Sequence, residues 1–188
     1  MKRNILICGD SFAADWTKKY NGFGWVNMLC DNFNVTNVAE AGVSEYKIYQ
    51  QLSKQKITDF DRVIISHTSA YRIPVEVHPI HSKDTLHYNC DFIYSDIKEH
   101  KNNPEVKCIV DLYENYFHVE YAIFVHDLIL KEIKGLCPNA INMTFFNSFN
   151  KDSIQLEDVF LENRGNINHL NEVGNKIVYN KILKLLNE

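Results

Sequence analysis

Short apolar runs and amphipathic stretches alternate through the first 70 residues, and this alternation constrains the fold more than any other feature. Each run is short enough for a buried strand, and each intervening stretch carries apolar side chains at helical spacing. The runs are residues 4–8, 34–38 and 61–66, and the intervening stretches lie within 23–32 and from 42 onward. Strands alternating with helices imply right-handed crossovers and a parallel sheet. The sequence therefore predicts an α/β protein.

The remainder of the chain adds one irregular segment and three further elements. Residues from about 70 to 102 contain two prolines and three closely spaced histidines, which indicates an excursion from the sheet. Asn103 and Pro104 then favour a helix start. Apolar side chains recur at helical spacing down to Gly135, as one kinked helix or two abutting helices. The last predicted elements are a fourth strand over 140–146 and a final helix capped by Asn171. We expect one domain over residues 1–188, with 70–102 as an irregular insertion.

Composition narrows the classes of function. A chain of 188 residues with 45% hydrophobic side chains can bury one sizeable core. The net charge of −4 and the scattered basic residues favour neither nucleic acid nor a membrane as a partner. The apolar run before Gly9 is too short for a signal peptide or a membrane span. Five widely spaced cysteines without a C-x-x-C pair indicate reduced thiols, so we expect a cytoplasmic protein.

Small and polar residues follow each of the first three strands. In an open parallel sheet, sites form in the crevice beyond the carboxyl ends of the strands. Acyl transfer through serine needs an exposed hydroxyl, a histidine to accept its proton and donors for the oxyanion. The segments that supply these groups are Gly9-Asp10-Ser11, Ala41 to Ser44, Ser66 to Ser69, and Asn166 to Asn171 ahead of the last helix.

These segments together resemble the GDSL/SGNH hydrolase family. Residues 5–12, with Gly9-Asp10-Ser11, look like the first block of that family, and Asn37 with Gly42 looks like the second. The run His169-Leu170-Asn171-Glu172-Val173-Gly174-Asn175 looks like the last block. The resemblance implies a three-layer α/β/α fold of the flavodoxin-like SGNH type. It also implies Ser11 as nucleophile, His169 as base, and an oxyanion site that includes the backbone N–H of Gly42 beside Asp10.

The sequence departs from the family pattern at two positions. The third block of the family carries an asparagine that supports the oxyanion, whereas this chain reads Ser66 to Arg72 without one, leaving Thr68 and Arg72 as candidate donors. The aspartate three residues before the histidine is replaced by Asn166, which can orient an imidazole ring but cannot stabilise imidazolium by charge. Asp158 and Glu162 are nearby acids that can substitute, and a Ser–His dyad steadied by a backbone carbonyl is the alternative.

Other residues have simpler interpretations. His67 is a second candidate base, although a solvated loop histidine is the safer interpretation. His78, His81 and His87 invite a metal site, but their spacing matches no known ligand pattern, so we expect solvated or loosely packed histidines and no metal. Trp16 and Tyr20, just after the Ser11 turn, either line a pocket or pack, and packing is the simpler interpretation. The aromatic ladder from Tyr113 to Phe124 predicts either core packing or the dimer face of a homo-oligomer.

The sequence thus favours a serine-dependent hydrolase of small acyl esters, acting on a small-molecule or glycan ester without metal or organic cofactor. In the simplest interpretation of the segments, Gly9-Asp10-Ser11 is only a strand-to-helix turn, Gly42 a turn glycine, and His169 a residue near a helix start. Two functional alternatives remain. One is an O-acyltransferase that uses the same Ser11–His169 site, and the other is a catalytically silent SGNH-like module that binds a glycan or a protein.

Overall fold

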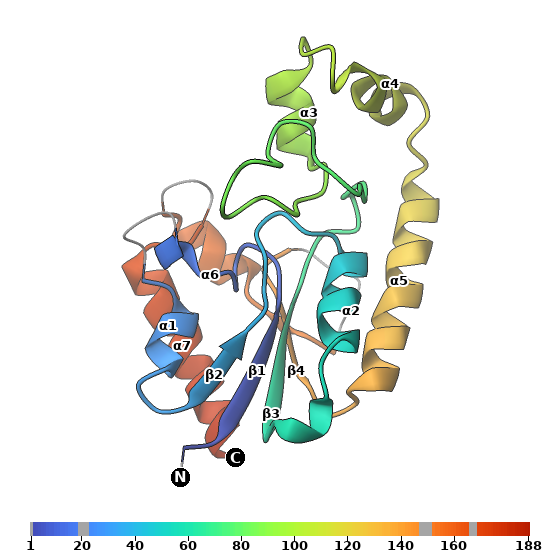
Figure 1. Cartoon of the computed structure of the whole chain (residues 1–188). Coiled ribbons are helices and arrows are strands. Elements are labelled where there is room, and N and C mark those ends of the chain that lie inside the picture. Colours follow the sequence, from blue (N-terminus) through green and yellow to red (C-terminus); the bar gives the residue numbers. More distant parts are fainter. Residues whose placement is uncertain (1, 19–22, 147–151, 166–168) are drawn as a thin grey trace.

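The fold is built on a central sheet of five parallel strands, flanked by helices (Figure 1). The computed structural model describes residues 2–18, 23–146, 152–165 and 169–188. The strands occur in the order β2-β1-β3-β4-β5 across the sheet. Their bounds are β1 Asn4–Gly9, β2 Asn34–Asn37, β3 Arg62–His67, β4 Ile141–Thr144 and β5 Ile154–Gln155. The predicted α/β class and parallel sheet are confirmed.

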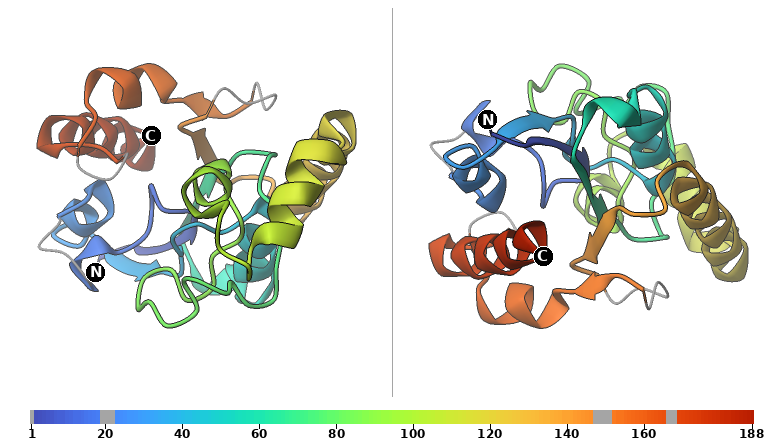
Figure 2. Two further views of the ribbon diagram at one scale, coloured as in Figure 1. Left: turned by 90° about the horizontal axis from the view of Figure 1, so that it is seen from above. Right: turned by 90° about the horizontal axis from the view of Figure 1, so that it is seen from below.

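Helices cover both faces of the sheet, as the views from its two ends show (Figure 2). The short α1 and the long α7 lie on one face, and α2 and α5 lie on the other (Figure 1). The bounds are α1 Trp25–Leu29, α2 Glu45–Ser53, α3 Tyr94–His100, α4 Lys107–Asn115, α5 Val119–Leu136, α6 Glu157–Glu162 and α7 Glu172–Asn187, with 3-10 turns at Trp16–Lys18 and Ile57–Asp59.

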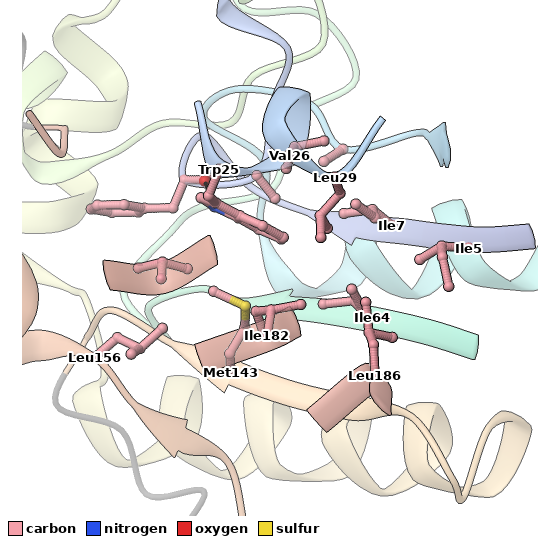
Figure 3. Close-up of a cluster of buried hydrophobic side chains, with 14 of the residues drawn as sticks. Ile5, Ile7, Trp25, Val26, Leu29, Ile64, Met143, Leu156, Ile182 and Leu186 are labelled. Carbon is pink, nitrogen blue, oxygen red and sulfur yellow. Dashed lines mark hydrogen bonds between the residues drawn. The ribbon is translucent and has the colours of Figure 1, made fainter. Parts of the chain in front are cut away.

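Strand β1 is the centre of the core because its side chains alternate between two buried faces. It lies between β2 and β3, with Ile7 paired to Asn37 on one side and to Ile64 on the other. Ile5 and Ile7 contribute to the cluster beneath α1 and α7, which Figure 3 shows in close-up. Leu6 contributes to the second cluster, beneath α2 and α5. A strand buried on both faces must be apolar at consecutive positions, which explains the uninterrupted run in the sequence.

Helix α4, strand β5 and helix α6 depart from the sequence-based expectation. The stretch after residue 103 divides into α4 and α5, which is the two-helix alternative. Helix α4 begins at Lys107 and not at the predicted start, because the Asn103 side chain accepts a hydrogen bond from the Glu105 N–H and residues 104–106 form turns. Strand β5 and helix α6 were not predicted, since both are too short to give a periodic signal.

The segment 70–102 lies over the carboxyl ends of the strands (Figures 1 and 2). It is held at its base by an antiparallel bridge between Ile73 and Phe92. Phe92 is buried with Val106 and Val110 in a small separate cluster. The segment also contains α3, so the predicted irregular insertion includes one helix. Its position above the sheet makes it part of the surroundings of any site at this edge.

The outer face of α5 carries exposed apolar side chains. Tyr121, Phe124 and Leu128 recur at helical spacing there, with exposed fractions of 66%, 58% and 44%. The core interpretation of this part of the aromatic ladder is therefore wrong. The dimer-face interpretation stays a prediction. Within the described residues, no helix is both long enough and apolar enough to cross a membrane.

The packing of α7 on the sheet gives a direct test of the core. Ile182 is fully buried in the cluster beneath α1 and α7, so Ile182→Ala is expected to lower the free energy of unfolding by about 2–5 kcal/mol. Val173 lies on the same helix with 59% of its surface exposed. Val173→Ala is the matched control and is expected to change stability by less than about 0.5 kcal/mol. Urea unfolding followed by circular dichroism measures both values, and equal losses would contradict the assigned orientation of α7.

Candidate functional site

The turn after β1 presents Ser11 at the carboxyl edge of the sheet. β1 ends at Gly9, where a Cβ atom would lie 2.7 Å from the Ser66 Cβ, so glycine is required for the close approach of β1 to β3. Residues 11–13 form a turn in which the N–H groups of Ala13 and Ala14 donate to the Asp10 carbonyl oxygen. Ser11 itself is half-buried. The sequence therefore produces a tight turn with one serine at its open side.

Asp10 holds this turn from inside the protein. Its side chain is fully buried, and its Oδ1 accepts a hydrogen bond from the Phe12 N–H at 3.1 Å. The Thr68 hydroxyl donates to the Asp10 Oδ2 at 3.0 Å, and the Arg72 guanidinium donates to the same oxygen at 2.9 Å. Burial raises the pKa of the Asp10 carboxyl, while the Arg72 charge opposes that shift. The carboxylate thus links the Ser11 turn to the loop that follows β3.

The structure brings His169 to the Ser11 turn from the other end of the chain. The indole Nε1 of Trp16 donates to the Ser11 carbonyl oxygen at 2.7 Å. The His169 ring lies 4.2 Å from the Trp16 ring and 5.2 Å from the Phe12 ring, centroid to centroid. His169 therefore packs against the two aromatic side chains that flank Ser11. The Ser11 hydroxyl makes no hydrogen bond to any described residue.

The last sequence block fixes the start of α7 and, with it, His169. The Asn171 side chain caps the helix by accepting from the Gly174 N–H at 2.9 Å, as predicted. The Asn175 amide donates to the Leu170 carbonyl at 3.1 Å, and its oxygen accepts from the Trp25 N–H at 3.0 Å. A Cβ atom at Gly174 would lie 2.8 Å from the Asn163 Cβ. Asn171, Gly174 and Asn175 thus each have a structural task beside His169.

Gly42 follows β2 in a left-handed conformation, with φ of +77°. A Cβ atom there would lie 2.6 Å from the Cys90 Cβ and 3.8 Å from the His87 Cδ2. Glycine is required on both grounds. The Gly42 carbonyl accepts from the Asp91 N–H at 3.0 Å, so the segment 70–102 rests directly on this turn. Among the described residues, neither the Gly42 N–H nor the Ser11 N–H donates to another protein group.

Thr68 and Arg72, the predicted substitutes for the missing asparagine, are both engaged with other groups. The Thr68 hydroxyl is fully buried against Asp10. Arg72 Nη1 donates to the Val43 carbonyl at 2.8 Å, and Nη2 contacts Asp10. Both side chains position Asp10 in this structure, and their role toward an oxyanion stays a prediction.

The predicted partners of His169 are only partly described. Asn166 lies outside the described residues, as does Tyr20. Asp158 and Glu162 are on α6 with exposed side chains, an arrangement that favours neither as the buried acid of a triad. Trp16, for which packing is the simpler interpretation of the sequence, contacts both the Ser11 backbone and the His169 ring. A tryptophan shortly after the serine is the sequence signal for this contact, but sequence alone does not distinguish it from core.

A buried ion pair lies beside the Asp10 network. Glu45, the first residue of α2, accepts from His67 Nδ1 at 2.7 Å through Oε1 and from the Thr68 N–H at 3.0 Å through Oε2. His67 is 1% exposed at the end of β3, so the expectation of a solvated loop histidine is wrong. Its Nε2 lies 2.9 Å from the Asn142 Oδ1. A third buried side chain, His126 of α5, donates from Nε2 to the Thr68 carbonyl at 3.1 Å.

The contacts of His67 require a proton on both ring nitrogens. The Asn142 amide nitrogen donates to the Ala140 carbonyl at 3.0 Å, which turns the Asn142 oxygen toward His67. His67 therefore donates to an amide oxygen on one side and to a carboxylate on the other. Burial lowers the pKa of His67, but the Glu45 charge outweighs it and raises that pKa above its ordinary value. Burial likewise opposes ionisation of Glu45, yet the His67 charge lowers the Glu45 pKa to about 2. His67 is thus held as a cation and cannot act as a base.

A cavity of about 340 Å³ lies on the α5 side of this network. Apolar side chains from α4, α5 and the loop after β3 form most of its wall, and Glu45, Arg72 and His126 contribute polar groups at its inner end. Arg72 connects it to the Ser11 turn through Asp10. Ser11 and His169 do not line the cavity, so it is separate from the Ser11 turn in this structure.

His78, His81 and Asp96 converge within the segment 70–102, and their ligand atoms lie within 4.8 Å of one another. The His78 Nδ1 accepts from the N–H groups of Ile80 and His81, both at 3.3 Å, which leaves the proton of a neutral ring on Nε2. The His81 Nε2 lies 3.1 Å from the Asp96 Oδ1 and donates to it. Burial opposes ionisation of Asp96, but the two histidines lower its pKa below the ordinary value. The His78 Nε2 lies 3.6 Å from the Asp96 Oδ2 and has no hydrogen-bond partner among the described residues. These three side chains could therefore hold a cation, and His78 is fully buried rather than solvated.

No model of a known protein family matches this sequence, and neither does any curated protein sequence.

The Glu45–His67 pair predicts a specific dependence of stability on pH. Glu45→Gln leaves a buried cation without its counterion, so the free energy of unfolding should fall by about 3–5 kcal/mol. The depressed pKa of Glu45 stabilises the folded state above its ordinary pKa of 4.5, and this contribution is lost toward pH 2. The raised pKa of His67 stabilises below its ordinary pKa of 6.5, and this contribution is lost as the pH rises through the raised value. The difference between wild type and variant should be largest between pH 4.5 and 6.5.

Urea unfolding midpoints measured across this pH range check the prediction. The control is Asp59→Asn, which breaks the exposed Lys56–Asp59 pair and should cost less than about 1 kcal/mol. A loss for Glu45→Gln as small as that of the control, or one independent of pH, would contradict the assignment of His67 as a buried cation.

Proposed function

We propose that this protein is a serine-dependent hydrolase of small acyl esters, with Ser11 as nucleophile and His169 as general base. The observation that carries the proposal is the meeting of the two ends of the chain at the carboxyl edge of β1. There, the His169 ring packs at 4.2 Å against Trp16, and Trp16 in turn holds the Ser11 carbonyl at 2.7 Å. The carboxyl edge of an open parallel sheet is the usual location of a binding site.

Two further observations support this site. The first is that the N–H groups of Ser11 and Gly42 donate to no described residue, since donors without a protein partner can stabilise an oxyanion without reorganisation. The second is the strand order 2-1-3-4-5, which is the flavodoxin-like order. That order, with helices on both faces of the sheet, fits the three-layer SGNH-type architecture that the sequence motifs suggest.

In the proposed reaction, the His169 imidazole takes the proton of the Ser11 hydroxyl as its oxygen attacks the ester carbonyl. The carbonyl oxygen becomes an oxyanion that accepts hydrogen bonds from the N–H groups of Ser11 and Gly42. When the C–O bond of the ester breaks, the imidazolium returns the proton to the leaving alcohol. Water then attacks the acyl-enzyme with His169 again as base, and the acid and the free Ser11 hydroxyl are released.

The base in this mechanism acts without an aspartate at position 166. Replacing the aspartate of a Ser–His–Asp triad by asparagine costs roughly 10⁴-fold in kcat in a protease. The proposed enzyme is therefore slow unless another group supplies transition-state stabilisation. An acyltransferase uses the same steps with a sugar hydroxyl in place of water, and a small acyl group on a glycan or small-molecule carrier is the substrate class that we favour. The proposed reaction uses no metal or organic cofactor.

A fluorophosphonate probe tests the nucleophile directly. Wild-type protein should be labelled at Ser11, and Ser11→Ala should abolish both labelling and hydrolysis of p-nitrophenyl acetate. His169→Ala should slow both by at least about 1000-fold, because the hydroxyl loses its base. Ser53→Ala is the control, since Ser53 is exposed at the end of α2 and distant from the turn. Absence of labelling in the wild type would exclude the hydrolase and favour the silent binding module, whereas acetyl transfer to added sugars would identify a transferase.

A further inference from the structure

Two histidines and one aspartate of the segment 70–102 converge at the spacing of metal ligands. The His81 Nε2 lies 3.1 Å from the Asp96 Oδ1, and the His78 Nε2 lies 3.6 Å from the Asp96 Oδ2. The ligand atoms of all three residues lie within 4.8 Å of one another. Two ligand atoms of a tetrahedral zinc ion are about 3.3–3.5 Å apart. The two measured separations lie on either side of this range, so a small adjustment brings the groups to one ion.

The His78 side chain provides an observation that hydrogen bonding within the protein does not explain. It is fully buried, and its Nε2 has no hydrogen-bond partner among the described residues. A buried polar atom without a partner is costly and therefore rare in folded proteins. This nitrogen points to the same place as the His81 Nε2 and the Asp96 carboxylate. An ion held between the three side chains would supply the missing partner.

Apolar packing holds the two histidines in position. The His78 ring lies against the Phe92 ring, with 4.3 Å between centroids, and against the His81 ring at 4.6 Å. Phe92 is itself buried in the small cluster with Val106 and Val110. An apolar surround excludes water from the ligand atoms and strengthens their attraction for a cation.

Asp96 is held from the other side, in the first turn of α3. Its Oδ2 accepts from the Ile93 N–H at 3.2 Å, which fixes the carboxylate at the start of the helix. The two histidines belong to the turn 78–82, in which the Ser82 N–H donates to the His78 carbonyl at 3.0 Å. The ligands therefore come from two separate parts of the segment, and an ion bound to them joins the turn 78–82 to α3.

Zinc binds the lone pair of a neutral imidazole and displaces any hydrogen from that nitrogen, so the site requires no particular charge state before binding. The hydrogen of each ring then lies on Nδ1. The His81 side chain is 29% exposed, and water can accept that hydrogen. The His78 Nδ1 accepts from the N–H groups of Ile80 and His81 at 3.3 Å, contacts longer than an ordinary hydrogen bond. Zinc binding must release them, so these two amides report on occupancy.

We propose that His78, His81 and Asp96 form a binding site for a divalent transition-metal ion, and that Zn²⁺ is the ion these ligands fit best. Two imidazoles and one carboxylate suit Zn²⁺, whereas Mg²⁺ and Ca²⁺ prefer oxygen ligands. Three protein ligands leave the fourth tetrahedral position to water. The bound ion ties the turn 78–82 to α3 and so stabilises the segment over the carboxyl edge of the sheet. The site does not depend on the proposed hydrolase function.

Zinc binding to the full chain, produced without a histidine tag and freed of metal with a chelator, tests the site. The wild type should bind one Zn²⁺ in competition with a colorimetric zinc chelator. Zinc at about 100 times its dissociation constant should raise the thermal unfolding midpoint by about 5–10 °C, because only the folded chain brings the ligands together. The amide NMR signals of Ile80 and His81 should shift on binding.

Substitutions of the ligands separate this site from binding elsewhere. His81→Gln and Asp96→Asn should each weaken zinc binding at least about 100-fold, since loss of a group that only orients a ligand already costs about 10- to 100-fold. His118→Asn is the matched control. His118 caps α5 by accepting from the Tyr121 N–H, and asparagine can keep that cap. This variant should bind zinc as tightly as the wild type.

The proposal is supported by one bound ion whose affinity falls in His81→Gln and Asp96→Asn but not in His118→Asn, with shifts of the Ile80 and His81 amides. Zinc uptake that is unchanged in both ligand variants, as binding to the exposed cysteine thiols would give, overturns it. Failure of the wild type to bind at micromolar zinc also overturns it. Circular dichroism of the metal-free proteins verifies folding. If Asp96→Asn is unfolded, His81→Gln decides alone, because that side chain is partly exposed.

Discussion

The buried carboxylate of Asp10 is the constraint on which the geometry of the site depends. It receives hydrogen bonds from the Phe12 backbone, the Thr68 hydroxyl and the Arg72 guanidinium, and these groups come from the loops after β1 and β3. A fully buried carboxylate is costly unless each oxygen has partners. The loops can therefore move apart only by exposing or orphaning this group. Because Ser11 is the next residue, its position is determined by the same network.

Sequence patterns predicted the parts of the fold that bury apolar surface with a regular period. The runs over 4–8 and 61–66 identified β1 and β3, and the Asn171 cap identified the start of α7. Strand β5 has two residues and leaves no such period. The placement of segment 70–102 was not predictable either, since long-range polar contacts such as Lys47 with Asp91 hold it, and these have no local signature.

The residues of the candidate site divide in the same way, into those that a sequence pattern predicts and those whose surroundings depend on long-range contacts. The sequence could predict that Ser11 and His169 lie at the same edge of the sheet, because both come from segments that flank its carboxyl edge. Thr68 was predicted as a donor from its position in the chain, but its partner depends on the depth at which Asp10 is buried, and sequence does not report depth. His67 was misjudged for the same reason. From sequence alone, a polar residue at the end of a strand is expected to be exposed to solvent. In the structure, Glu45 of α2 covers His67 and pairs with it.

Two buried acids, Asp10 and Glu45, lie close enough that the Glu45 charge raises the pKa of Asp10, and each has its own cation. Arg72 balances Asp10, and His67 balances Glu45, so these two buried pairs carry no net charge between them. Neutral pairing limits the long-range field at the edge, and a developing oxyanion there must be stabilised by donors in direct contact. The proposed donors, the N–H groups of Ser11 and Gly42, belong to separate segments of the chain, namely the β1 turn and the β2 turn. Their relative positions therefore depend on the long-range contacts that join these segments more than on the local conformation of any one of them.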